Sequence, residues 1–289
     1  MPTAIVIVNK ASGGHNAGAE SAAALLSDVG IKARVLTGPV RDQIRKSRRA
    51  AEDLVVVDGG DGTISAAIAA HAGTDRPVGI LPAGTMNLLA SDNHLPIDRR
   101  AAAAVIAAGH VKPLHAGRMG NRLFLHSAFT GLPARIGMHR ENFRGRMGLF
   151  TKARLAVHAL STLRRDPTLS LTSEEGAALT GPTFVVAVGG FGGPMLPTPE
   201  RTDIASGQLT ALALKAEDAA DLARLAVRGV FSTLADDASV ETLTFTNAAL
   251  RAPRSHVYAM MDGESVLLRV PAPIAIVPDA AWLLAPAAP

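Results

Sequence analysis

Residues 54–63 read LVVVDGGDGT, four apolar residues that run into an acidic, glycine-rich turn. Similar apolar runs occur at 5–8 (IVIV) and 78–81 (VGIL), and segments with helical character separate them. Strands that are apolar throughout and alternate with helices are typical of a parallel sheet covered on both faces. The first hundred residues are therefore predicted to form a Rossmann-like parallel α/β domain. The expected strands are 5–8, 32–36, 54–57 and 78–81. The expected helices are 17–28, 41–50, 64–72, one that follows the turn at 82–85, and 99–108.

The pattern changes after about residue 111, where short strand-like runs follow one another between turn signals. This arrangement is typical of an antiparallel β-sandwich. The expected strands are 114–119, 122–129, 168–172, 183–188, 209–214, 240–246, 256–261 and 266–270, with one basic helix at 146–165. A last apolar run at 274–277 is predicted to return to the first domain. We therefore expect a first domain of residues 1–112 with 274–289, and a second domain of residues 113–273.

The composition limits the chemistry. The chain has no cysteine, which excludes disulfides, thiolate nucleophiles and thiolate zinc sites. Aromatic residues make up only 3% of the chain, which argues against single-stranded nucleic acid, because that ligand binds to aromatic stacking platforms. No apolar run reaches the roughly 18 residues of a membrane-spanning helix, and the N-terminus lacks the basic region of a signal peptide. The sequence predicts a cytoplasmic protein, at most peripherally associated with the inner face of the membrane.

Glycine-bearing turns follow three of the expected strands, at 9–14 (NKASGG), 59–63 (GGDGT) and 82–85 (PAGT). The carboxyl ends of parallel strands share one edge of a sheet, so these turns are expected to converge there. Glycine lets backbone amides approach an anion closely, and a helix N-terminus favours phosphate. Asp61 would repel a phosphate unless a Mg²⁺ ion lay between them. Each turn alone also fits an ordinary strand-to-helix connection, but the three together predict a phosphate site.

Four motifs, in this order, resemble the diacylglycerol-kinase catalytic family. They are Asn9-x-x-Ser12-Gly13, Gly59-Gly60-Asp61-Gly62-Thr63, Pro82-x-Gly84-Thr85-x-Asn87 and Asp262-Gly263-Glu264. The family includes bacterial lipid kinases and the sphingosine and ceramide kinases, and it is distantly related to the NAD kinases. The resemblance covers nearly the whole chain. It implies a nucleotide-binding Rossmann-like domain followed by a β-sandwich domain that binds the lipid substrate.

The resemblance implies an ATP-dependent lipid kinase that also uses Mg²⁺. Asp61 is the expected metal ligand and one of the expected catalytic residues. The residues implied to bind the nucleotide and its phosphates are Asn9, Lys10, Ala11, Ser12, Gly13, Thr37, Gly59, Gly60, Asp61, Gly62, Thr63, Gly84, Thr85 and Asn87.

Asp262 and Glu264 are the other expected catalytic residues. In the family, the acidic residues of this motif supply the general base for the lipid hydroxyl. An alcohol is a poor nucleophile at neutral pH, and a positioned carboxylate that takes its proton is worth typically about 10²–10⁴-fold in rate. Asp262-Gly263 is also a good two-residue hairpin turn between strand-like runs. The two interpretations are compatible, because a turn can present a carboxylate.

Several positions depart from the family pattern. Leu88 and His115 stand where the family usually has aspartate, and Ser206 replaces an aspartate that often supports a structural Mg²⁺. Leu88 and His115 leave open a second hypothesis, a catalytically weak regulator that binds a nucleotide or a lipid. A third hypothesis is an enzyme like the NAD kinases, with a soluble acceptor.

A basic segment at 135–165 carries eight Lys and Arg residues against one acidic residue, Glu141. Apolar residues interleave with these cations, which fits a helix that lies on an anionic membrane. Packing of the same stripe on the sandwich is the alternative. The sequence predicts a lipid substrate at a membrane surface and no nucleic-acid partner. It leaves open whether the protein forms a homodimer and which lipid it phosphorylates, among diacylglycerol, ceramide, a sphingoid base and phosphatidylglycerol.

Overall fold

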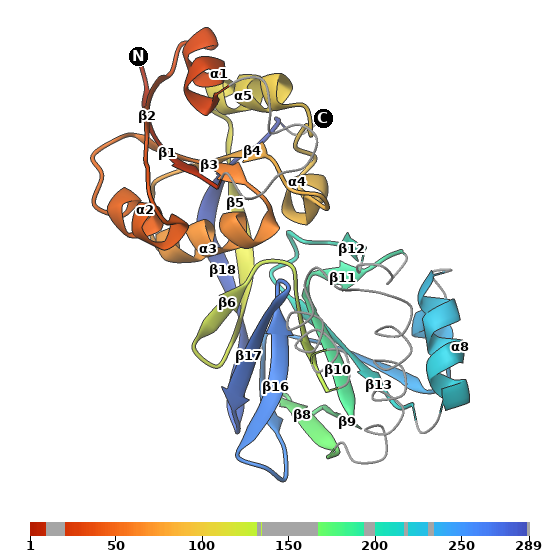
Figure 1. The fold of residues 1–289 in the computed structure, drawn as a ribbon. Coiled ribbons are helices and arrows are strands. Elements are labelled where there is room, and N and C mark those ends of the chain that lie inside the picture. The colour runs from red at the N-terminus through yellow and green to blue at the C-terminus, as the bar shows by residue number, and fades with distance from the viewer. Residues whose placement is uncertain are drawn as a thin grey trace, which may run out of the picture. The chain divides into compact units, whose positions relative to one another are not determined.

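The computed structural model describes residues 1–9, 21–131, 134, 167–193, 200–216, 219–230 and 234–287 (Figure 1). The chain divides into one unit of residues 1–115 and 278–289 and a second unit of residues 116–277. The divisions fall within two long strands, β5 (Val111–Met119) and β18 (Ala272–Leu284). The boundaries expected from the sequence were after residues 112 and 273.

The first unit contains a parallel sheet in the order β2-β1-β3-β4, followed by the end of β18. Its strands are β1 (Thr3–Val8), β2 (Lys32–Val35), β3 (Leu54–Gly59) and β4 (Val78–Pro82). The apolar runs that predicted β1, β3 and β4 are buried along nearly their whole length. Burial of such strands on both faces is the reason that their sequences do not alternate.

The described helices of this unit are α1 (Ala22–Asp28), α2 (Val40–Ser47), α3 (Asp61–His71), α4 (Leu88–Asp92) and α5 (Arg99–Ala108). Helices α1 and α5 contact each other, as do α2 and α3. Ser21 begins α1 and Asp98 begins α5 by accepting a first-turn backbone N–H, and Gly109 ends α5 with a left-handed backbone. One core of this unit consists of aliphatic side chains from the sheet and from α1 and α5, including Ala4, Val6, Leu25, Leu26, Val56, Ala102, Ala103 and Ile106.

The second unit contains a six-stranded antiparallel sheet in the order β14-β13-β10-β7-β16-β17. Its strands are β7 (Ser127–Thr130), β10 (Thr183–Val188), β13 (Leu209–Leu214), β14 (Val240–Phe245), β16 (His256–Met261) and β17 (Glu264–Arg269). A second layer is formed by β8 (Leu169–Ser173), β9 (Ala178–Gly181), β15 (Asn247–Arg251) and the first part of β18. Strand β6 (Arg122–Phe124) pairs with the end of β5, and β11 (Gly190–Phe191) pairs with β12 (Arg201–Thr202).

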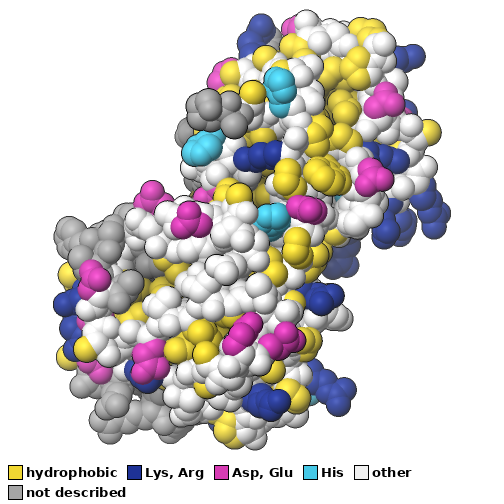
Figure 2. Space-filling view, turned by 180° about the vertical axis from the view of Figure 1, so that it is seen from behind, with side chains coloured by type: hydrophobic (Ala, Val, Ile, Leu, Met, Phe, Trp, Pro, Cys, Tyr) yellow, Lys and Arg dark blue, Asp and Glu magenta, His cyan; other side chains and the backbone are white. Residues whose placement is uncertain are grey.

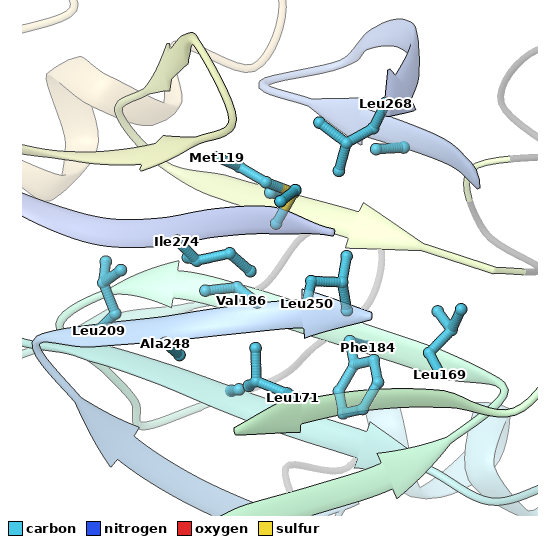
Figure 3. Packing of buried hydrophobic residues seen from close by; sticks show 14 of the residues in the cluster. Met119, Leu169, Leu171, Phe184, Val186, Leu209, Ala248, Leu250, Leu268 and Ile274 are labelled. Carbon is cyan, nitrogen blue, oxygen red and sulfur yellow. The ribbon is translucent and has the colours of Figure 1, made fainter. Parts of the chain in front are cut away.

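Side chains from both layers of the second unit interdigitate in the core between the layers (Figure 3). Leu171 and Leu250 come from one layer, and Phe184, Val186 and Leu209 come from the other. Aliphatic side chains dominate this core, as the low aromatic content predicts. The predicted fold, a parallel α/β unit followed by an antiparallel sandwich, is confirmed.

The structure differs from the expected elements at several points. Strands β9 and β15 and the helix α8 (Ala219–Val230) were not predicted. The expected strand 122–129 is broken into β6 and β7, and helix α3 begins three residues before the expected position, at Asp61. The basic helix expected at 146–165 and the first residues of the helix expected at 17–28 lie outside the described residues. Within the described ranges, no helix is long and apolar enough to cross a membrane.

Candidate active site

The turns after β1, β3 and β4 meet at the carboxyl edge of the parallel sheet. A Cβ atom added to Gly84 would lie 2.8 Å from the Cα of Gly60, so only glycine fits where these two turns touch. Asn9, directly after β1, donates from Nδ2 to the Oγ1 of Thr63 at 2.8 Å, and its backbone N–H donates to the carbonyl of Asp58 at 2.9 Å. The predicted convergence is therefore confirmed for the described parts of the three turns. Lys10, Ala11, Ser12 and Gly13 lie outside the described residues.

Asn87 shapes the turn after β4. It is buried and adopts a left-handed backbone with φ 48°. Its Oδ1 accepts the N–H of Gly84 at 3.0 Å, and its Nδ2 donates to the Gly84 carbonyl at 3.1 Å. These bonds use the amide of Asn87 inside the protein, so this residue holds Gly84 against Gly60, whereas Thr85 beside it is exposed.

Helix α3 begins in the GGDGT turn, with Gly60 as its N-cap. Glycine has no side chain that could accept a first-turn N–H, so the N-terminus of α3 has no side-chain cap. The backbone amides there, together with the positive end of the helix dipole, are suited to an anion. In the sequence from 59 to 63, Gly59 thus ends strand β3, Gly60 is an N-cap without a side chain, and Asp61 to Thr63 form the first turn of α3.

Asp61 is the first residue of α3, and its Oδ1 is buried without a hydrogen-bond partner among the described residues. A buried carboxylate oxygen that lacks a partner is costly unless a cation approaches it. Carboxylate oxygen is the ligand type that Mg²⁺ prefers, and Mg²⁺ is commonly held by one or two carboxylates together with substrate phosphates. The described residues contain no group of three acidic or histidine side chains that could hold a metal alone. Asp61 therefore fits a metal that is shared with phosphate.

Sequence reasoning missed two features that support these turns. The amide of Gln43, in α2, bonds both the N–H and the carbonyl of Val8 and also the carbonyl of Gly38. It thereby joins the end of β1 to the turn after β2, where Thr37 is exposed. A buried glutamine among the charged residues of α2 gives no sequence signal of this role.

The second missed feature is the ion pair between Asp58 and Arg99. The Nη2 of Arg99 lies 2.5 Å from the Oδ2 of Asp58, and the two side chains are only 10% and 11% exposed. Burial raises the pKa of the Asp58 carboxyl, while the charge and hydrogen bond of Arg99 act in the opposite direction. The pair lies directly before Gly59 and fixes the end of β3. An acidic residue that ends a buried strand is the one sequence signal for it.

In the second unit, Asp262 and Gly263 form a two-residue hairpin between β16 and β17. Both have positive φ angles, 47° and 84°, and Met261 pairs with Glu264 across the hairpin. These are the features of a type I′ turn, for which Asp-Gly is a favoured sequence. The hairpin expected from the sequence is confirmed.

The carboxylate of Asp262 accepts three backbone N–H groups. Its oxygens lie 2.7 Å from the nitrogen of Leu125, 2.9 Å from that of His126 and 3.2 Å from that of Ser127. These residues form the connection between β6 and β7, which explains the break in the strand expected at 122–129. Asp262 is thus engaged in holding a turn.

Glu264 has a different environment, although it is only two positions away. Its side chain is 65% exposed, and its Oε2 lies 3.9 Å from the Nη1 of Arg122, which is also exposed. An ion pair at that distance in water is weak. Of the two carboxylates expected to act as a base, Glu264 is therefore the one that is open to solvent.

The residues that depart from the family pattern have local partners. The Nδ1 of His115 accepts the backbone N–H of Asp279 at 3.0 Å, at a position where Asp279 has a positive φ. Ser206 donates its N–H to the carbonyl of Asp203 in a tight turn. Leu88 is the first residue of α4.

Comparisons with known proteins identify the family of this chain. A family model described as the diacylglycerol kinase catalytic domain matches residues 3–119. A diacylglycerol kinase of Mycobacterium tuberculosis is 31% identical over 248 residues, which cover 81% of this chain and 77% of that protein. A diacylglycerol kinase of Staphylococcus epidermidis is 36% identical over 100 residues, which cover 33% of this chain and 32% of that protein.

A solved structure of a diacylglycerol kinase from Bacillus anthracis shares the fold. It matches 99% of this chain and 97% of its own chain with a TM-score of 0.69, at 16% sequence identity. The long match to the Mycobacterium protein, the family model and the glycine turns lead to the same assignment, and we conclude that this chain belongs to the diacylglycerol kinase family of lipid kinases.

Proposed function

We propose that the protein transfers the γ-phosphate of ATP to the hydroxyl of a membrane lipid, with diacylglycerol as the first expected acceptor. The name of the M. tuberculosis relative supports this choice of acceptor. The single observation that carries the proposal is the meeting of Gly84 with Gly60 at the N-terminus of α3, which has no side-chain cap. There the Oδ1 of Asp61 is buried without a hydrogen-bond partner in the described parts of the chain. A triphosphate with its divalent cation satisfies both features at once.

Phosphoryl transfer needs little covalent chemistry from a protein, so positioning and charge supply most of the catalysis. The amides of the GGDGT turn would bind phosphate oxygens, and Asp61 would hold the divalent cation, which would offset the phosphate charge. Asn9 and Asn87 keep the neighbouring turns in place through the hydrogen bonds described above. Glu264 would accept the proton of the lipid hydroxyl, and Asp262 would keep the hairpin of Glu264 in position.

This proposal can be tested with labelled ATP. The ATP is mixed with the protein, Mg²⁺ and vesicles that each contain one acceptor lipid. The acceptors are diacylglycerol, ceramide, a sphingoid base and phosphatidylglycerol, and NAD in solution replaces the vesicles in one further sample. We expect label in phosphatidic acid and its loss when EDTA removes the metal. Label in NAD, or in no lipid, would contradict the proposal, and label in another lipid would change the acceptor but retain the reaction.

A further inference from the structure

Residues 125–127, which lead from β6 into β7, are bound by side chains at both their backbone N–H groups and their carbonyls. The carboxylate of Asp262 accepts the N–H groups of residues 125–127. The guanidinium of Arg201 bonds the carbonyls of the same segment, with its Nη1 2.7 Å from the oxygen of Leu125 and 3.3 Å from that of His126. An acidic and a basic side chain, 61 positions apart in sequence (262 − 201), thus hold one short backbone segment.

Arg201 also attaches this segment to the neighbouring strands. Its Nη1 lies 3.4 Å from the carbonyl of Val188, at the end of β10, and its own strand β12 pairs with β11, where Arg201 is opposite Phe191. A guanidinium has five N–H donors in a planar fork, so it can serve several carbonyls from one position. Lysine has a compact ammonium group and can replace only part of this pattern.

The held segment determines the position of the hairpin that contains Glu264. Asp262 donates its own N–H to the carbonyl of Ser127 at 3.0 Å, in addition to the three bonds that its carboxylate accepts. Met261 pairs with Ala128, so the last residues of β16 also lie against β7. A shift of residues 125–127 would therefore move Asp262 and, through the two-residue turn, the backbone of Glu264. A displacement of about 1 Å in a catalytic group can reduce the rate by on the order of 10²-fold.

We propose that Arg201 is a positioning residue for phosphoryl transfer: it fixes residues 125–127 from the carbonyl side, as Asp262 fixes them from the amide side, and so holds the Glu264 carboxylate in place. This inference rests on the proposed function, because it takes Glu264 as the base. In this role Arg201 acts through the backbone of residues 125–127 and not by contact with a substrate. The sequence pattern gave no indication of it, since Arg201 belongs to a two-residue strand and to none of the four motifs.

The first experiment compares kcat and KM for wild-type protein, Arg201→Gln, Arg201→Lys and a control, Arg224→Gln. Arg224 lies in α8 of the same unit and bonds Asp237 at 3.0 Å, so its loss removes a comparable interaction away from residues 125–127. We expect Arg201→Gln to lower kcat by about 10–100-fold with an unchanged KM for ATP. Arg201→Lys should recover part of that loss, and Arg224→Gln should keep the wild-type kcat.

The second experiment separates positioning from a general structural effect by repeating Arg201→Gln in a Glu264→Gln background. If Arg201 acts through Glu264, its replacement should change the residual rate by less than about twofold, because no base remains to be misplaced. An equal loss in both backgrounds would overturn the proposal. Hydrogen exchange at the amides of residues 125–127 should become faster in Arg201→Gln, and unchanged exchange would also count against it.

The two proposals fail in different ways. Wild-type protein that phosphorylates no acceptor overturns the proposed function and the role of Arg201 together. Active wild-type protein with an Arg201→Gln variant of unchanged kcat overturns only the role of Arg201 and leaves the proposed function intact.

Discussion

At the scale of single residues, the three carboxylates that the motifs single out, one in the first unit and two in the second, have three different environments. The Oδ1 of Asp61 is buried without a hydrogen-bond partner in the described part of the chain, Asp262 accepts three backbone N–H groups, and Glu264 is mostly exposed. The same functional group is thus buried without a partner, engaged in holding a turn, or open to solvent. These differences lead to separate expectations for the three residues.

Asp61→Asn should abolish phosphate transfer and leave the protein as stable as the wild type, or slightly more so. The carboxylate gains about 0.3–1 kcal/mol from the helix dipole, but its buried and unsatisfied oxygen costs about 1–3 kcal/mol. The neutral amide loses the first contribution and lowers the second, because an uncharged group costs less to bury without a partner than a carboxylate does. Transfer assays and urea unfolding of both proteins measure the two effects. Full activity of Asp61→Asn would remove Asp61 as the metal ligand.

Asp262→Asn and Glu264→Gln should separate stability from catalysis. Asn can offer only one acceptor oxygen to the three N–H groups of residues 125–127, so we expect a loss of about 1–3 kcal/mol in unfolding free energy. Glu264→Gln should leave stability unchanged, because the side chain is exposed, and should lower kcat by about 10²-fold or more. Urea unfolding and steady-state kinetics are the measurements. A Glu264→Gln variant with wild-type kcat would show that another group takes the proton.

At the scale of elements, helix α3 joins the GGDGT turn at its N-terminus to a buried histidine at its C-terminus. His71 is 2% exposed, and its Nε2 lies 2.9 Å from the Oγ of Ser47 in α2. Burial, followed by the charges of Arg76 and Arg48, lowers the pKa of His71 to about 4. The imidazole is therefore neutral in the folded protein over a pH range in which an unfolded chain would protonate it.

The low pKa of His71 predicts a loss of stability in acid. In the unfolded chain this histidine takes up a proton below about pH 6.5, whereas in the folded protein it does so only near pH 4. The unfolding free energy should therefore fall as the pH decreases from 6.5 to 4, by about 3 kcal/mol from this residue alone. Urea unfolding of wild type and His71→Gln across that range measures the difference. Parallel pH profiles of the two proteins would contradict the prediction. Asp237, whose pKa is lowered to about 2, contributes mainly below that range.

The elements that the sequence predicted best are those determined by local pattern. The bounds of α5 were predicted without error, and the apolar runs of β1, β3 and β4 identified the parallel sheet. Strand β15 was missed because residues 240–251 pass from one layer of the sandwich to the other without a glycine or proline to mark the change. The break at residues 125–126 depends on a carboxylate 137 positions away, which no local pattern contains.

For the candidate site too, the sequence predicted what depends on the order of strands and helices but not the contacts between distant residues. Parallel topology alone requires the turns after β1, β3 and β4 to share one edge, so their convergence followed from the order of strands and helices. The residues that stabilise the turns were not predictable, because Gln43, Arg99 and Arg201 act on backbone or side chains 35, 41 and 76 positions away. Gln43 lies in a helix rich in charged residues, Arg99 begins an alanine-rich helix, and Arg201 belongs to a two-residue strand. Each becomes recognisable only when the fold brings its partner near.

At the scale of the whole molecule, positive charge is concentrated in two sequence segments, 41–49 and 135–165. The first is described by the structure: Arg41, Arg45, Lys46, Arg48 and Arg49 are exposed on α2 and the residues after it. Figure 2 shows Lys and Arg side chains gathered on one side of the first unit. Arg76, just before β4, bonds the carbonyls of Ser47 and Ala50, so the end of α2 lies at the amino edge of the sheet. The glycine turns occupy the opposite, carboxyl edge, and a membrane bound at the end of α2 would therefore be remote from them.

Because residues 41–49 also carry a concentration of positive charge, they provide a charge-matched control for membrane binding by residues 135–165. We propose that the second segment attaches the protein to anionic lipid, because its cations interleave with apolar residues that can enter the interface. Replacing Arg164 and Arg165 together by alanine should weaken binding to anionic vesicles by up to about 30-fold, since each cation near such a surface contributes about 1 kcal/mol. The same double replacement at Arg48 and Arg49 should change binding by less than about threefold.

Co-sedimentation with vesicles of rising phosphatidylserine content, at low and at physiological salt, measures both variants. Equal losses in the two variants would mean that net charge alone drives attachment, and unchanged binding of the Arg164/Arg165 variant would exclude these two cations from it.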